Sequence, residues 1–139
     1  MKLASFPALV LLSLAMVVFN ACSNTGASLT GEWTLVSYGD ASNPTPAIVG
    51  VETSISFGQN NQFGGNVGCN SFGGDYTVSG DALVIGSVMS TMMFCEQTSA
   101  QESAVLAILS DKTMTITQSG NLLTLSSVDG KSVVTLEKK

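Results

Sequence analysis

Short segments in which apolar and polar residues alternate make up most of the chain after residue 30. The stretch Glu32–Tyr38 places Trp33 and Leu35 on one face, and residues 53–57 (TSISF) alternate in the same way. A period of two is typical of a strand with one buried face. These segments therefore predict strands that cover a common core.

Turn residues separate several of the predicted strands. Residues 77–85 (TVSGDALVI) and 117–125 (TQSGNLLTL) each place Ser-Gly followed by Asp or Asn between apolar runs. Tight hairpin turns need residues that accept a positive φ, and Gly and Asx supply them. A third turn at Val128–Lys131 leads into a last strand at 132–137. The pattern predicts consecutive antiparallel hairpins.

One segment follows a helical rather than a strand period. Residues 96–110 (EQTSAQESAVLAILS) begin just after Cys95, and Glu96 and Glu102 stand near the start, where the helix dipole favours acids. Apolar residues recur at intervals of three and four. The predicted apolar stripe consists of Ala100, Ala104, Val105, Ile108 and Leu109. We expect an α+β, mostly β fold of about eight strands with one helix packed against it.

The N-terminus has the form of an export signal. Lys2 precedes an apolar run over residues 3–19, which is short for a membrane span of ~20 residues and ends at Asn20-Ala21-Cys22. The segment FNAC resembles a bacterial lipobox, with Phe19 where Leu, Val or Ile is usual. The sequence predicts a signal peptide at 1–21, lipidation of Cys22 and a flexible tether at 22–30. The alternatives are ordinary cleavage near Ala21 or an uncleaved anchor.

The predicted lipidation of Cys22 determines how many cysteines remain to pair with each other. The chain has three cysteines, and if lipid occupies Cys22, Cys69 and Cys95 remain as an even pair in an exported protein. An oxidising compartment favours a disulfide between them.

The glycine-rich stretch 64–76 (GGNVGCNSFGGDY) suggests three kinds of site. A strand rather than a helix follows it, which argues against a dinucleotide-binding loop. A nucleophilic Cys69 would need a base, and the chain has no histidine. We therefore interpret Cys69 as half of a structural disulfide.

Composition excludes several classes of function. After removal of the signal, four lysines, no arginine and ten acidic residues leave a net charge of −6, which argues against nucleic acid as a partner. No Ser-His-Asp triad can form, and we predict no catalytic residue, no cofactor and no metal site. A pair of carboxylates is the remaining catalytic possibility.

Three methionines are concentrated in residues 88–94 (VMSTMMF). Methionine commonly fills irregular gaps in a core, and that is the expectation for Met89, Met92 and Met93. The alternatives are an adaptable binding surface or a site for soft copper.

Taken together, residues 68–86 (GCNSFGGDYTVSGDALVIG), the following MMFC and the acidic helix resemble the META domain family. The opening GEWTLVSY and the closing VDGKSVVTLEK are also similar to that family, so the resemblance covers about residues 29–138. It implies a META (HslJ-like) domain over 31–138, a small, partly open antiparallel β-barrel with one helix, and a disulfide between Cys69 and Cys95. Many members are envelope lipoproteins, in agreement with Cys22.

We therefore expect a non-enzymatic, monomeric lipoprotein of the bacterial cell envelope, at the outer membrane or the outer face of the cell membrane. Its lipid anchor would bind the membrane, and its domain would bind an envelope protein or support envelope integrity under stress. One alternative is a carrier that holds a small apolar ligand in an open barrel, in a cavity lined by Met89, Met92 or Phe94. Another is a carboxylate-based hydrolase.

Overall fold

The computed structural model describes residues 28–139, and the predicted signal peptide and Cys22 lie outside them. Ten strands and one helix make up this part of the chain. In chain order they are β1 (Gly31–Asp40), β2 (Thr45–Pro46), β3 (Ser54–Phe57), β4 (Gln62–Asn66), β5 (Ser71–Ser79), β6 (Ala82–Ile85), β7 (Met89–Ser90), α1 (Ser99–Leu109), β8 (Thr113–Ser119), β9 (Leu122–Ser127) and β10 (Ser132–Lys138).

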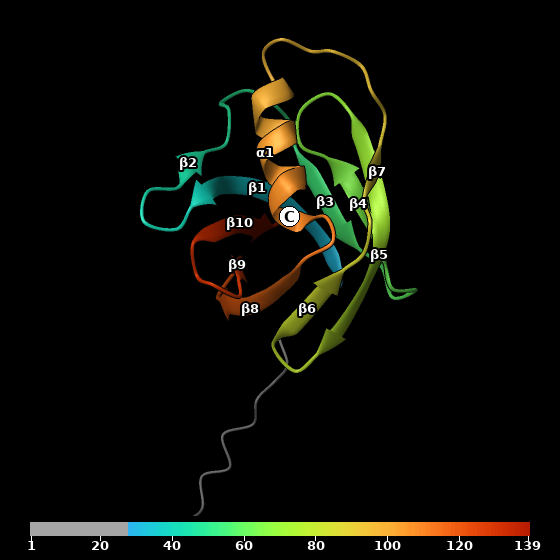
Figure 1. Cartoon of the computed structure of the whole chain (residues 1–139), viewed down its shortest axis with the longest axis vertical. Coiled ribbons are helices and arrows are strands. Elements are labelled where there is room, and N and C mark those ends of the chain that lie inside the picture. Colours follow the sequence, from blue (N-terminus) through green and yellow to red (C-terminus); the bar gives the residue numbers. More distant parts are fainter. Residues whose placement is uncertain (1–27) are drawn as a thin grey trace, which may run out of the picture.

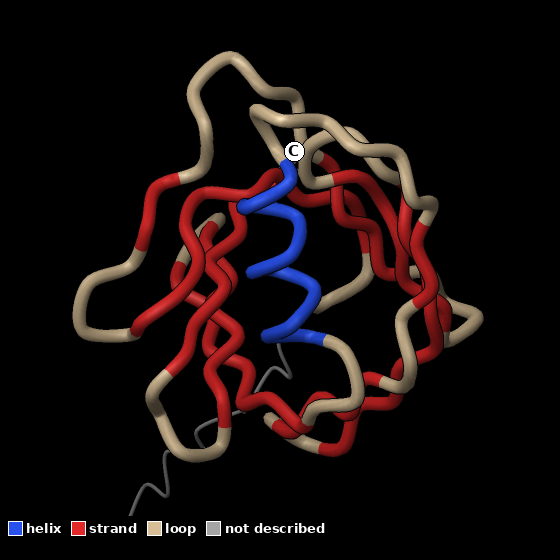
Figure 2. Tube along the Cα trace, turned by 45° about the horizontal axis from the view of Figure 1, so that its top comes forward, coloured by secondary structure: helices blue, strands red, loops and turns tan. Residues whose placement is uncertain are grey.

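Eight of the strands form a closed antiparallel barrel. Their order around the ring is β1-β3-β4-β5-β6-β8-β9-β10, and β10 pairs with β1 to close it. The short β2 and β7 pair with β1 and β5 at the margin of the ring. The views in Figures 1 and 2 show the strands surrounding α1, which lies across the opening of the barrel. The predicted barrel with one helix is confirmed, and the ring is closed rather than partly open.

Alternate residues of the strands point into the barrel and fill it, as their period of two predicts. Trp33 and Leu35 of β1 lie inside, together with Ile55 and Phe57 of β3. The interior is completed by one or two apolar residues from each remaining strand of the ring and from the helix. These residues are Phe63, Phe72, Tyr76, Leu83, Ile85, Val105, Leu109, Met114, Ile116, Leu123, Leu125, Val134 and Leu136.

The alternation in β1 shifts by one residue at a bulge. Leu35 pairs with Leu136 and Ser37 with Thr135, so Val36 is the extra residue. After the bulge the buried position is Tyr38, which is one residue out of phase with Trp33 and Leu35. A bulge bends a strand and increases its twist, which helps a sheet to curl into a barrel.

The predicted hairpin turns are present. Gly80 joins β5 to β6 with φ 64°, and Gly120 joins β8 to β9 with φ 61°. Side-chain-bearing residues rarely adopt such φ values, so glycine suits both positions. The turn at residues 128–131 joins β9 to β10, as expected.

The helix begins later than predicted, and its buried face includes polar residues that the prediction left out. It starts at Ser99, because residues 96–98 form a turn after Cys95. Val105 and Leu109 are buried as expected, whereas Ala100 is exposed. The rest of the buried face is polar and consists of Gln101 and Glu102. The predicted stripe is confirmed at four of its five positions, because Ala104 and Ile108 are partly buried and pack against the core beside Val105 and Leu109. The difference is that the face continues to Gln101 and Glu102, where Ala100 was expected.

The folded part starts before Gly31. Leu29, which the sequence places in the tether, is buried, and its carbonyl oxygen accepts a hydrogen bond from Trp33 Nε1 at 2.8 Å. The boundary between tether and domain therefore lies at or before Leu29. Between residues 28 and 139, no helix has both the length and the apolar character needed to cross a bilayer.

Candidate functional site

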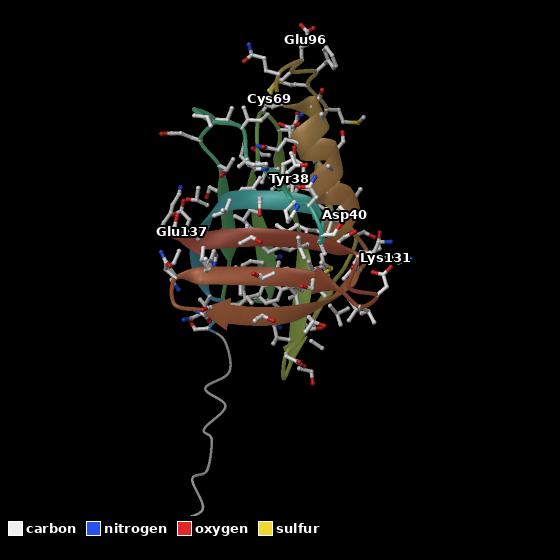
Figure 3. The ribbon with its side chains drawn as sticks, turned by 90° about the vertical axis from the view of Figure 1, so that its left-hand side faces the viewer. Tyr38, Asp40, Cys69, Glu96, Lys131 and Glu137 are labelled. Atoms are coloured by element: carbon white, nitrogen blue, oxygen red, sulfur yellow. A yellow bond between two sulfur atoms is a disulfide. The ribbon has the colours of Figure 1, made fainter. Side chains whose placement is uncertain are left out.

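The segment Gly68-Cys69-Asn70 lies between β4 and β5 at one end of the barrel. A disulfide joins Cys69 to Cys95, the two cysteines that the sequence predicts to pair, and their Cα atoms are 6.3 Å apart. Figure 3 shows Cys69 and Glu96 at the same end of the molecule. The disulfide thus fastens the glycine-rich loop to the chain that leads into α1.

Glu102 of α1 lies beneath this loop and is buried. Its Oε1 accepts hydrogen bonds from the backbone N–H groups of Cys69 and Asn70, the second at 2.8 Å, and a longer one from the Thr98 hydroxyl at 3.5 Å. Its Oε2 accepts one from the Asn70 side-chain amide at 2.7 Å. The carboxylate therefore takes the place of backbone partners for a loop that belongs to no strand.

Asn70 connects Glu102 to the segment before Cys95. Its Nδ2 also donates to the carbonyl oxygen of Met93 at 2.8 Å. Its Oδ1 accepts from the Met93 N–H at 2.8 Å and from the Thr91 hydroxyl at 2.9 Å. The Asn70 amide thus makes the four hydrogen bonds that its two donors and two lone pairs allow.

The neighbouring Gln101 performs a similar role on the other side of the helix. Its Nε2 donates to the Val67 carbonyl oxygen at 2.6 Å, and its Oε1 accepts from the Ile48 N–H at 2.9 Å. Both contacts are made by a side chain with no exposed surface. Gln101 and Glu102 together hold two loops, the one at Ile48 and the one at residues 67–70, around the N-terminal half of α1.

Gly68 leaves the room that this packing needs. A Cβ atom at Gly68 would lie 2.6 Å from the Thr98 Cβ and 2.7 Å from Glu102 Oε1. Any side chain would push the loop away from the helix. The Gly-Cys-Asn triplet therefore combines a close approach, a disulfide and a hydrogen-bonding amide in three consecutive residues.

Two opposing effects act on the pKa of Glu102. Burial raises the pKa, but hydrogen bonds from the Asn70 side chain, from the Cys69 and Asn70 N–H groups and from the Thr98 hydroxyl lower it by more, so the pKa lies below its usual value. Glu102 is therefore a carboxylate at neutral pH, and it carries its charge into a buried position.

Sequence reasoning missed this role of Glu102. The sequence placed Glu102 near the start of the helix, where the dipole favours acids, and did not predict its burial. The other nine acids of the chain are exposed. A signal was present, because Thr98, Gln101, Glu102, Val105 and Leu109 share one face of a helix at spacings of three and four. Polar residues on that face concealed it from a search for apolar stripes.

The segment that we call the methionine loop, residues 89–94, is on the surface. Met89, Met92, Met93 and Phe94 have 80%, 96%, 61% and 82% of their surface exposed. The expectation that the methionines fill an irregular core was wrong. The reason is that the chain leaves the sheet after β7 and crosses the rim of the barrel, where none of the helices and strands in residues 28–139 covers it.

A shallow pocket of about 340 Å³ separates the methionine loop from α1. Its lining is mixed, with the buried Glu102 contributing to its floor. The apolar residues are Met92, Met93, Phe94 and Leu106, and the neutral polar ones are Asn70, Ser90, Thr91, Ser99 and Ser103. Met89 lies outside it, beside a second surface pocket along β5. The carrier alternative predicts a deep cavity lined by Met89, Met92 or Phe94, whereas the pocket that Met92 and Phe94 line lies on the surface and both side chains are largely exposed.

Few groups in the described residues offer catalytic chemistry. Cys69 and Cys95 are held in the disulfide, and both oxygens of Glu102 accept hydrogen bonds from the protein. Within residues 28–139, no three His, Cys, Asp or Glu side chains gather closely enough to hold a metal ion. The features that stand out at this end of the barrel are a fixed apolar loop and a buried carboxylate.

Comparison with known proteins agrees with this architecture. A family model described as META domain matches residues 27–139. A search of curated proteins finds no match. Three solved structures share the fold, and each covers about four fifths of this chain.

A protein from Burkholderia xenovorans, solved by NMR, is 20% identical with a TM-score of 0.64, and 80% of this chain and 83% of that chain are covered. A second NMR structure is 21% identical with a TM-score of 0.59 and covers 79% and 90%. A crystal structure of a DUF4847 family protein from Bacteroides vulgatus is 14% identical with a TM-score of 0.60 and covers 80% and 94%.

Proposed function

The chain belongs to the META domain family, and from that premise we propose that it is a non-enzymatic lipoprotein of the bacterial cell envelope whose domain binds another protein. The observation that carries the proposal is the methionine loop. Four large apolar side chains are exposed together there, and contiguous exposed apolar residues mark interaction sites.

The loop is built to stay in its exposed position. The disulfide fixes Cys95 immediately after it, and Asn70 binds both the N–H and the carbonyl of Met93. A loop that is already ordered loses less conformational entropy when a partner binds. Its rigid support thus favours recognition over a role in core packing.

The filled interior argues against the carrier alternative. Trp33, Ile55, Leu83, Leu125 and Leu136 have no exposed surface and occupy the barrel from several sides. An apolar ligand would have to displace them, at a cost comparable to that of repacking a core. The exposed positions of the other acids likewise offer no support to the hydrolase alternative.

Export and lipidation rest on the sequence around Cys22. A Cys22→Ser variant of the full chain should lose incorporation of a clickable palmitate analogue and should move from the membrane fraction to the soluble one, or remain uncleaved. A variant that still enters the detergent phase at its mature mass would contradict lipidation.

Partner binding can be tested in the same cells. A photo-crosslinking residue at Phe94 should give an adduct that the same residue at Val128, which is 75% exposed on the β9–β10 turn, does not give. Adducts from both positions, or from Val128 alone, would show that the methionine loop is not the binding surface.

A further inference from the structure

We propose that the pocket between the methionine loop and α1 binds an arginine or lysine side chain that projects from an extended, otherwise apolar segment of a partner protein. This inference rests on the proposed protein-binding function and names the chemistry that the partner must have. It follows from the charge in the floor of the pocket, the four apolar residues in its mixed lining and the position of the pocket on the molecule.

The charge in the floor has no counter-ion among residues 28–139. Every group that donates to Glu102 is neutral: two backbone N–H groups, an amide and a hydroxyl. Such donors stabilise a carboxylate but leave its net charge in place, and buried charges in proteins are usually paired. Oε2 accepts a single hydrogen bond from the protein, so it has lone-pair capacity left for a partner's N–H.

The lysines of the described chain do not line the pocket. Lys112 follows the C-terminal end of α1, and Lys131 lies in the β9–β10 turn. Lys138 Nζ lies 4.9 Å from the centroid of the Trp33 ring, and Lys139 pairs with Glu32 at 2.9 Å. Glu96, which is exposed next to the methionine loop, adds a further negative charge at this end.

The walls of the pocket fit the stem of a long basic side chain. Met92, Met93 and Leu106 supply flexible apolar surface, on which the methylene groups of arginine or lysine can pack while the charged head reaches the floor. Phe94 adds an aromatic ring at the rim, a preferred neighbour for a guanidinium group. Apolar residues that flank the basic residue would cover the exposed methionines.

The other occupants of such a surface fit less well. A second copy of this chain would bring the same acidic groups against each other. An anionic membrane would be repelled by Glu96 and Glu102. The described chain also enters the barrel at the end far from the methionine loop (Figures 1 and 3). The first described residue is six positions after Cys22, and six residues span at most about 20 Å. A lipid on Cys22 would therefore hold at the membrane the end of the barrel that lies far from the methionine loop.

The test uses the full chain in detergent micelles and two synthetic peptides. Both are nine residues long with alternating leucine and serine, and the central residue is arginine in one and citrulline, its uncharged isostere, in the other. We expect the arginine peptide to bind about tenfold more tightly than the citrulline peptide, as measured by fluorescence anisotropy. The reason is that citrulline cannot form the charge-assisted contact with the Glu102 carboxylate. The preference should shrink at high salt.

Two variants connect the preference to the pocket. Phe94→Ser should weaken binding of the arginine peptide about tenfold, whereas Val128→Ser, an equally exposed control on another turn, should leave it unchanged. Glu102→Gln should abolish the difference between the two peptides. Glu102→Gln can also disturb the loop. If that variant does not fold, the comparison of Phe94→Ser with Val128→Ser still tests whether the peptide binds at the pocket.

Several results would overturn the proposal: no binding of either peptide, equal affinity for both, or equal effects of Phe94→Ser and Val128→Ser. Phe94-dependent binding to phosphatidylethanolamine–phosphatidylglycerol vesicles in place of the peptide would identify a membrane as the occupant and also overturn it. The cellular crosslink from Phe94 tests the proposed function separately. If Phe94 crosslinks to a protein in cells but the domain binds the two peptides equally, the proposed protein-binding function stands and the proposed basic side chain is rejected.

Discussion

The Asn70 side-chain amide donates to Glu102 Oε2 across 2.7 Å, and this contact joins the loop before β5 to the first turn of α1. Asn70 uses its remaining hydrogen bonds on Thr91 and Met93. One pair of side chains therefore determines how the helix, the glycine-rich loop and the methionine loop lie relative to each other.

Glu102→Gln should lower the free energy of unfolding by about 1.5–3 kcal/mol. The glutamine would direct an NH₂ group at the Asn70 amide or at the loop N–H groups, so that donor faces donor where a charged acceptor stood. Urea unfolding followed by the fluorescence of Trp33, which has no exposed surface, measures the change. Glu96→Gln, at an exposed acid, is the control and should have little effect.

The stability that Glu102 contributes should depend on pH. Its pKa in the folded protein lies below the ordinary value of 4.5, so the folded state favours the charged form. The contribution is fully present above about pH 5 and is lost as the pH falls through the lowered pKa. The difference in unfolding free energy between the wild type and Glu102→Gln should be constant from pH 7 to about pH 5 and should shrink below that.

Other acids also make the stability depend on pH, and taking the difference in unfolding free energy between the wild type and Glu102→Gln removes their effect. Asp40 and Asp129 also have lowered pKa values, because the side chain and N–H of Ser42 bind the first, and the Ser127 hydroxyl and the Lys131 N–H bind the second. These groups are present in both proteins, so their effects cancel. A difference that stayed constant down to pH 3 would show that Glu102 does not titrate in this range.

Removal of the disulfide should destabilise the domain by about 2–5 kcal/mol without changing its fold. The closed loop spans 26 residues, for which the chain-entropy model gives about 3.5 kcal/mol. The barrel has its own core, so Cys69→Ser/Cys95→Ser should retain the far-ultraviolet circular dichroism spectrum and melt at a lower temperature. Unreduced mass spectrometry that finds two free thiols in the mature wild-type protein would reject the disulfide.

Gly68→Ala should cost about 1–3 kcal/mol of stability, because the new methyl group would overlap with Thr98 and with Glu102 Oε1. Gly86→Ala is the matched control: there the nearest atom, the Asp75 carbonyl oxygen, is 3.6 Å from the added Cβ. Thermal melts of the two variants compare them directly. Equal melting temperatures would mean that the loop can move away from α1 without penalty.

Local patterns in the chain were sufficient for much of the barrel. The alternation in residues 53–57 and the turns around Gly80 and Gly120 predicted strands and hairpins that the structure contains. They succeed because side-chain period and turn dihedrals depend on neighbouring residues only. Resemblance to a family supplied the barrel, as a partly open one, and the pairing of β10 with β1 that closes it joins two ends of the domain that no local pattern connects.

The positions of the methionine loop and Glu102 depended on contacts between distant segments. Nothing local distinguishes a methionine at the rim of a barrel from one in its core, since the outcome depends on whether another element covers it. Glu102 likewise reads as a solvated acid until the loop 32 residues earlier supplies its N–H donors. Burial and charge stabilisation are properties of the assembled fold, and so only the tertiary structure revealed the apolar loop and the carboxylate beneath it.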